Sequence, residues 1–127
     1  MRLLLDTHVL IWTVGEDQAL GQRALESIVD QANDVFVSPA SVWEIAIKVA
    51  QGTLKLGGDL NAAMTDANFI ELPITFAHAE LAGALPPHHK DPFDRMLIAQ
   101  AQAEGLVLVT ADQRIPRYGV RTMPATR

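Results

Sequence analysis

The segment Leu3-Leu4-Leu5-Asp6-Thr7, near the start of the chain, decides the expected fold. A short continuous apolar run of this kind is typical of a strand buried on both faces, as in a parallel sheet. The run ends at a carboxylate and a hydroxyl, and a helix is expected to follow directly from His8. An unpaired carboxylate at the end of a buried strand is costly, so function explains Asp6 more readily than structure does.

Further apolar runs alternate with helical patterns along the rest of the chain. Strands are expected at 34–37, 69–72 and 106–109, with a weaker strand at 120–123. Helices are expected at 19–29, from Ser38-Pro39 to near Gly52, and at 60–67, 76–84 and 93–104. Strands that alternate with helices predict an α/β fold in which helices cover both faces of a parallel sheet.

Two of the expected helices carry further local signals, one at its first residues and one along its apolar face. Asp91-Pro92 combines an N-cap residue with a proline in the first turn, and an N-cap is the simplest explanation of Asp91. In the helix that begins at Ser38-Pro39, four residues are spaced to form the apolar face: Val42, Ile45, Ala46 and Val49.

Composition and charge limit the class of protein. The chain has 127 residues, of which 49% are apolar, so one domain spanning 1–127 with one core is expected. Its 15 acidic and 10 basic residues give a net charge of −5, the wrong sign for general attraction to a phosphate backbone. Any contact with nucleic acid must therefore be local.

The absence of cysteine excludes a disulfide framework, a thiolate metal site and a cysteine nucleophile. The first residues reach Asp6 after only three leucines, far short of the apolar core of a signal peptide or a membrane span. A cytoplasmic location with no membrane partner is therefore expected.

Four acidic residues occur where the fold would bring them together: Asp6, Glu44, Asp94 and Asp112. Two of them follow expected strands, and two lie in early turns of helices that follow loops. Ligands of open parallel sheets bind outside the carboxyl ends of the strands, so all four are expected to converge there. Four like charges in one pocket repel unless they are protonated or a divalent cation neutralises them. Hard oxygen ligands of this kind suit Mg²⁺ or Mn²⁺.

Hydroxyl side chains accompany these acids, namely Thr7, Ser38, Ser41 and Thr110, and are placed to orient carboxylates. Such a pocket is expected to bind one or two divalent ions, to polarise a phosphodiester oxygen and to lower the pKa of a bound water so that it attacks in line. Contacts to the flanking phosphates are expected from cationic side chains: Lys48, Arg95, Arg114, Arg117 and Arg121.

Three of the acids also have ordinary structural explanations. Glu44 is spaced to pair with Lys48 at i, i+4, which contributes roughly 0.2–0.5 kcal/mol on a helix surface. Asp94 lies in a first helical turn, where the helix dipole favours a carboxylate. Asp112 lies in an expected turn, where aspartate is common.

The histidines and tryptophans favour structural explanations. His8, His88 and His89 show no zinc-like pairing and are expected to be solvated residues of loops or helix starts. Trp12 and Trp43 follow helical spacing and are expected in the core or at a dimer surface rather than as platforms for base stacking.

Two other classes of function are open to such a chain. Another phosphate-handling enzyme could use the aspartate after the first strand, but phosphotransfer of that kind requires a lysine beyond a late strand. The only lysines are Lys48, Lys55 and Lys90, and none is suitably placed. A non-catalytic RNA-binding module on the same fold would be marked by the loss of an acid, which is not seen.

The chain resembles the PIN domain family in four motifs, taken in order and spacing. They are Leu3-Leu-Leu-Asp-Thr-His-Val-Leu-Ile-Trp12, Ser38-Pro-Ala-Ser-Val-Trp-Glu-Ile-Ala-Ile-Lys48, His89-Lys-Asp-Pro-Phe-Asp-Arg-Met-Leu-Ile-Ala-Gln-Ala101 and Val107-Leu-Val-Thr-Ala-Asp112. The resemblance covers residues 2 to 123, and within the family it is to the VapC toxin ribonucleases of VapBC toxin-antitoxin pairs.

This resemblance implies a three-layer α/β/α fold and an endoribonuclease that depends on Mg²⁺ or Mn²⁺. It puts Asp6, Glu44, Asp94 and Asp112 in the family's acidic positions, as catalytic residues and metal ligands, and Thr110 in the position of its accessory hydroxyl. It also implies a homodimer, a structured RNA substrate such as transfer or ribosomal RNA, and a cognate VapB-like antitoxin that wraps the toxin and reaches into the acidic pocket.

Overall fold

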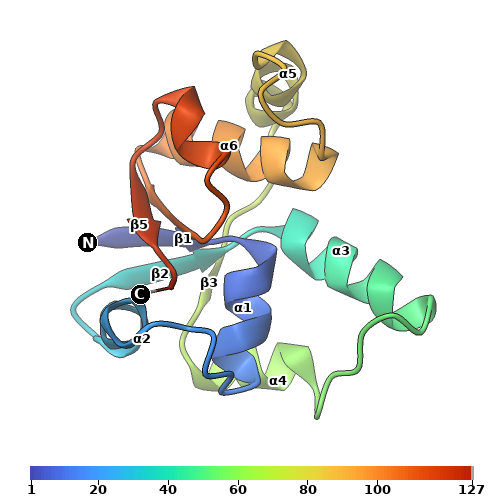
Figure 1. Cartoon of the computed structure of the whole chain (residues 1–127), viewed down its shortest axis with the longest axis vertical. Coiled ribbons are helices and arrows are strands. Elements are labelled where there is room, and N and C mark those ends of the chain that lie inside the picture. The colour runs from blue at the N-terminus through green and yellow to red at the C-terminus, as the bar shows by residue number, and fades with distance from the viewer. Residues whose placement is uncertain (127) are drawn as a thin grey trace.

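The apolar run at the start of the chain forms the central strand of a five-stranded parallel sheet (Figure 1). This strand, β1 (Arg2–Leu5), lies between β2 (Asp34–Val37) and β4 (Val107–Thr110). Leu3, Leu4 and Leu5 are 0% exposed because neighbouring strands and both helical layers cover them. The short strands β3 (Ile70–Glu71) and β5 (Thr122–Pro124) complete the order β3-β2-β1-β4-β5. The computed structural model describes residues 1–126, so Arg127, the last residue of the expected domain, lies outside the described residues.

Helices cover both faces of the sheet and give two separate apolar cores. One face is covered by α1 (Thr7–Val14), α2 (Gln22–Val29), α3 (Pro39–Ala50) and α4 (Leu60–Asp66). The opposite face is covered by α5 (Phe76–Ala84), α6 (Pro92–Glu104) and the 3₁₀ helix η1 (Ile115–Tyr118). Figure 1 shows α5 and α6 on one side of the sheet and α1, α2 and α4 on the other. The expected three-layer α/β/α fold is confirmed. None of the helices in residues 1–126 has the length and apolar character needed to cross a membrane.

Most expected elements are present, with differences at their ends. Strand 34–37 and helix 76–84 match the expected bounds, and Asp91 caps α6 as expected. The expected helix 19–29 begins only at Gln22, and the expected strand 69–72 shortens to two residues at the sheet edge. The last strand begins at Thr122 rather than at residue 120, because η1 and the left-handed Gly119 occupy the preceding segment.

The expected apolar face of α3 is wrong in part. Ile45 is buried, but Ala46 and Val49 are exposed. The buried residues of α3 are instead Ala40, Ser41, Glu44 and Ile45. The helix therefore turns an acidic residue inward, and leaves part of its apolar surface facing a groove between α3 and α4.

Candidate active site

Asp6 lies directly after β1, at the carboxyl edge of the sheet, and is buried. It is the N-cap of α1, since its Oδ1 accepts a hydrogen bond from the backbone N–H of Val9 at 2.9 Å. Its Oδ2 accepts a hydrogen bond from the hydroxyl of Thr110 at 2.5 Å. Burial raises the pKa of Asp6 above its ordinary value, while the bonds from Thr110 and Val9 act in the opposite direction. The residue thus has both a capping role and a carboxylate held at a strand end.

Thr110, the last residue of β4, connects two of the expected acids. Its Oγ1 donates to Asp6 and accepts the backbone N–H of Asp112 at 3.0 Å. The other hydroxyls serve the framework: Ser38 caps α3, and Thr7 donates to Ser41 at 3.1 Å, which ties α1 to α3. Thr110 is therefore the hydroxyl that orients a carboxylate.

Glu44 forms the expected pair with Lys48, but in a buried setting. Its side chain is 9% exposed, and its Oε2 lies 3.0 Å from Lys48 Nζ. Its other oxygen, Oε1, is buried and has no hydrogen-bond partner among the described residues. Leaving a buried acceptor unsatisfied costs about 1–3 kcal/mol. This oxygen atom is therefore suited to a ligand that brings its own positive charge.

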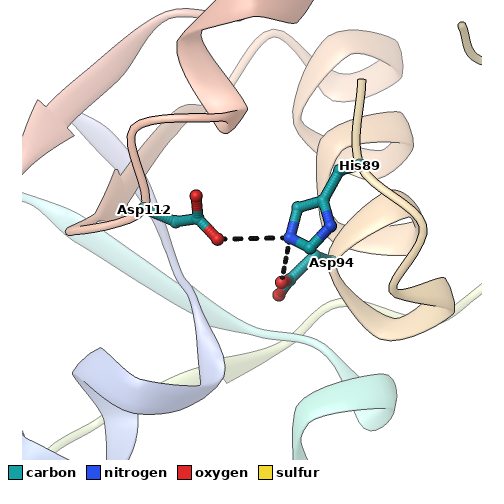
Figure 2. Close-up of side chains that lie close together, drawn as sticks. All are labelled: His89, Asp94 and Asp112. Atoms are coloured by element: carbon teal, nitrogen blue, oxygen red, sulfur yellow. Dashed lines mark ion pairs between the residues drawn. The ribbon is translucent and has the colours of Figure 1, made fainter. Parts of the chain in front are cut away.

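Asp94 lies in the first turn of α6, as expected, and its Oδ2 is 2.7 Å from Nε2 of His89. The same nitrogen lies 3.2 Å from Oδ2 of Asp112. Figure 2 shows the imidazole pointing between the two carboxylates, one from α6 and one from the loop after β4. Burial and the charge of Asp91 raise the pKa of Asp94 to about 6, against the lowering effect of His89.

His89 is the site residue that the sequence reasoning missed. It was expected to be solvated, but its side chain is 4% exposed and its ring lies against Asp94 and Asp112. The available signal was its position five residues before Asp94, next to a strong helix start. His8 and His88 are exposed, as expected.

The loop that carries His89 is held by two side chains from outside it. Arg95 donates to five carbonyl oxygens, those of Ala82, Gly83, Leu85, Pro86 and His89, at 2.7 to 3.5 Å. Tyr118 accepts the backbone N–H of His89 at 2.7 Å and donates to the carbonyl of Pro86 at 2.8 Å. Arg95 was expected to contact a phosphate, but its guanidinium is committed to the main chain.

Asp112 is held by a guanidinium. Nε and one terminal nitrogen of Arg114 lie 3.0 and 2.8 Å from its two carboxylate oxygens, and the Arg114 backbone N–H also donates to it at 2.9 Å. The hydrogen bond from the Arg114 side chain lowers the pKa of Asp112 to about 2. Asp112 is thus ionised and already paired.

The four expected acids lie close enough together for their charges to act on one another. Ligand atoms of His89, Asp94 and Asp112 lie within 4.8 Å of one another, and this is the compact group of possible metal ligands in residues 1–126. Asp6 and Glu44 lie outside that group, yet both raise the pKa of Asp94, and Asp112 raises that of Asp6. The donor set of carboxylate oxygens, with one unsatisfied atom on Glu44, fits a hard divalent cation.

Comparisons with known proteins show which family and fold the chain matches. Residues 3–120 match the PIN domain family. The chain is 33% identical over 116 residues to Ribonuclease VapC22 of Mycobacterium tuberculosis, an alignment that covers 89% of this chain and 88% of the relative.

Among solved structures, the fold is similar to that of VapBC2 from Rickettsia felis, solved with a DNA fragment from the promoter, with a TM-score of 0.73 at 15% identity. That alignment covers 97% of this chain and 98% of the other. DNA-bound VapBC from Salmonella typhimurium aligns with a TM-score of 0.70 at 19% identity, covering 97% of each chain.

Proposed function

Because the chain belongs to the PIN domain family, we propose that it is the toxin of a type II toxin-antitoxin pair and cleaves RNA with the help of Mg²⁺ or Mn²⁺. The observation that supports the proposal is that buried Asp6 and Glu44 lie near enough to half-buried Asp94, on a third element, for their charges to raise its pKa. The name ribonuclease given to the VapC relative supports RNA as the substrate class.

We propose that Asp6, Glu44 and Asp94 hold the metal, and that Asp112 completes the acidic pocket. The unpartnered Oε1 of Glu44 supports this choice, as does the raised pKa of Asp94, which a bound cation would lower. When bound, the cation would polarise a phosphodiester oxygen and bring the pKa of water toward neutrality. No side-chain nucleophile is then needed.

The chain's own residues have distinct parts in this proposal. Thr110 fixes the orientation of the Asp6 carboxylate through its short hydrogen bond. Lys48 and Arg114 pair with Glu44 and Asp112, and their partly exposed ends can neutralise phosphates on either side of the cleaved bond. These two side chains supply the local positive charge that a chain of net charge −5 otherwise lacks.

We further propose a VapB-like antitoxin as the partner and a homodimer as the assembly. Solved relatives of the same fold are VapBC pairs, and another is described as a toxin-antitoxin complex from Klebsiella pneumoniae. A groove of about 490 Å³ between α3 and α4, lined by apolar residues that include Val42, Trp43 and Met64, supports an apolar partner segment. Phe76 is 93% exposed at the start of α5 and suits a dimer contact. An RNA substrate implies action in the cytoplasm.

Expression of the chain in a bacterial host tests the toxin activity. Induction without an antitoxin should arrest growth and yield cleaved species in total RNA, and Asp6→Ala should relieve both effects at equal protein level. Lys55→Ala, an exposed change outside the acidic pocket, is the matched control and should remain toxic. Arrest that persists in Asp6→Ala would refute the proposed link between the acidic pocket and toxicity.

A further inference from the structure

The acidic pocket already contains nitrogen donors from the chain itself. His89 Nε2 lies 2.7 Å from Asp94 and 3.2 Å from Asp112, between two carboxylate oxygens that would otherwise repel (Figure 2). Nε2 lies close to both carboxylates, but it satisfies the geometry of a hydrogen bond with neither oxygen. With its side chain 4% exposed, His89 is a buried polar group aimed into the site.

The hydrogen bond at Nδ1 of His89 shows which ring nitrogen carries the proton. Nδ1 accepts the backbone N–H of Asp91 at 3.3 Å, which places the proton on Nε2. A metal-bound imidazole would need a free electron pair on Nε2 and a proton on Nδ1, where it would face the Asp91 N–H donor. The Nε2 proton of His89 therefore faces the carboxylates, and this nitrogen has no free electron pair for a metal.

Both carboxylate oxygens of Asp112 already have partners within the chain. Its Oδ1 accepts from the backbone N–H and from Nε of Arg114, and its Oδ2 pairs with a terminal guanidinium nitrogen while also facing His89. A carboxylate offers roughly four lone-pair positions, so Asp112 has little left for a cation.

Free oxygen atoms remain on the other acids. Glu44 Oε1 is unpartnered, and Asp94 uses only Oδ2 toward His89 among the described residues. Asp6 accepts one hydrogen bond on each oxygen, which leaves a lone pair on both. The atoms available to a cation therefore belong to Asp6, Glu44 and Asp94.

We propose that His89 and Arg114 fill the position that a second divalent cation would need, so that the pocket binds a single ion and Asp112 acts as a positioning residue. The inference rests on the proposed metal dependence and specifies the number of ions bound per chain. It predicts that His89 stays between Asp94 and Asp112, and Arg114 on Asp112, while the ion binds to Asp6, Glu44 and Asp94.

Counting bound Mn²⁺ tests the proposal without any measurement of activity. Titration of the full chain, followed by the electron paramagnetic resonance signal of free Mn²⁺ and by calorimetry, should give one ion per chain. His89→Ala and Arg114→Ala should each gain a second, weaker ion at Asp94 and Asp112. His88→Ala and Arg117→Ala, matched changes at exposed positions, should stay at one ion. Melting temperatures check folding, and the exposed Arg114 keeps the test valid if His89→Ala does not fold.

The results that would contradict the single-ion proposal differ from those that would contradict a metal-dependent ribonuclease. Two ions in the wild-type chain would overturn the single-ion proposal and leave a metal-dependent ribonuclease intact. A second ion in neither variant would equally overturn it. Coupling of bound Mn²⁺ to ¹⁴N that disappears in His89→Ala would show imidazole coordination and contradict the assigned proton position. Binding of no ion at all, together with RNA cleavage in EDTA, would instead contradict the metal mechanism itself.

Discussion

Each acid of the pocket has a local partner that would explain it as a structural residue. Asp6 caps α1, Glu44 pairs with Lys48, and Asp112 pairs with Arg114. Burial separates Asp6 and Glu44 from ordinary surface pairs, because a desolvated carboxylate is costly even when it is partly satisfied. The structural and functional explanations are therefore compatible, and the free oxygen on Glu44 is the atom that the structural one does not explain.

Removal of the Thr110 hydroxyl should weaken the site without removing an acid. Thr110→Val takes away the hydrogen bond to Asp6, and loss of such an orienting partner typically costs about 10–100-fold in metal affinity or activity. Thr110→Ser keeps the hydroxyl and should stay close to wild type. Initial rates of RNA cleavage and Mn²⁺ affinity measure the effect, and equal rates for the valine and serine variants would contradict the assigned role.

The pKa of Asp94 predicts a pH dependence of stability in the metal-free protein. This pKa is about 6 in the folded chain and about 4 in an unfolded one, so the folded state binds the proton more tightly. The contribution of Asp94 is then fully present below pH about 4 and is lost as the pH rises through about 6, with a magnitude on the order of 1–3 kcal/mol.

Urea unfolding of wild type and Asp94→Asn in EDTA, between pH about 4 and about 7, measures this contribution. The difference in unfolding free energy between the two proteins should change across the range in favour of the asparagine variant at the higher pH. A difference that stays constant with pH would contradict the raised pKa.

At the scale of elements, the site depends on how α6 and the segment before it are held. Arg95 crosses from α6 to the carboxyl end of α5 and to the loop that presents His89. It joins three parts of the chain with one guanidinium, which supplies donors in a fixed planar arrangement. The position of His89 therefore follows from packing between elements.

Arg95→Ala should destabilise the fold and also disturb the site. Hydrogen bonds from a charged donor contribute about 1.5–3 kcal/mol each, and a total loss of roughly 2–4 kcal/mol is expected because the exposed carbonyls regain water. Arg117→Ala, at an exposed position, should change stability little. Chemical denaturation gives both values, and equal stability of the two variants would refute the anchoring role.

The elements that carry strong local signals were predictable from the sequence. Asp91-Pro92 begins α6, and Gly105 ends it in the left-handed conformation with φ 67°. Four acids at strand and helix ends were also predictable as neighbours, because parallel strands present their carboxyl ends at one edge. The inward turn of Glu44 and the burial of His89 were not, since both depend on how α3 and the loop before α6 pack against other elements.

At the scale of the whole molecule, α3 faces two surfaces with different proposed uses. Glu44 is buried and raises the pKa of Asp94, while Val42, Trp43 and Ala46 line the groove toward α4. Trp43 is 64% exposed, which is consistent with a contact surface rather than with the core. An antitoxin bound in the groove would contact α3, the helix that also carries Glu44.

A charge introduced into the groove between α3 and α4 should weaken inhibition by the antitoxin without reducing toxicity. Ala46→Glu introduces a carboxylate into the groove, so it should weaken antitoxin binding while RNA cleavage continues. Val49→Glu, exposed on the same helix but outside the groove lining, is the control and should remain inhibited. Growth on co-expression of toxin and antitoxin reports the result, and full inhibition of Ala46→Glu would argue against this groove as the antitoxin site.

RNA cleavage by the purified protein in EDTA, followed by stepwise addition of Mn²⁺ or Mg²⁺, tests the central claim most directly. The account predicts no cleavage in EDTA, recovery as the free metal rises, and no recovery in Asp6→Asn, which keeps the shape of the side chain but removes its charge. A thermal melt confirms that the variant is folded. Full cleavage in excess EDTA, or unchanged cleavage by Asp6→Asn, would contradict a metal-dependent ribonuclease built on the acids at the edge of the sheet.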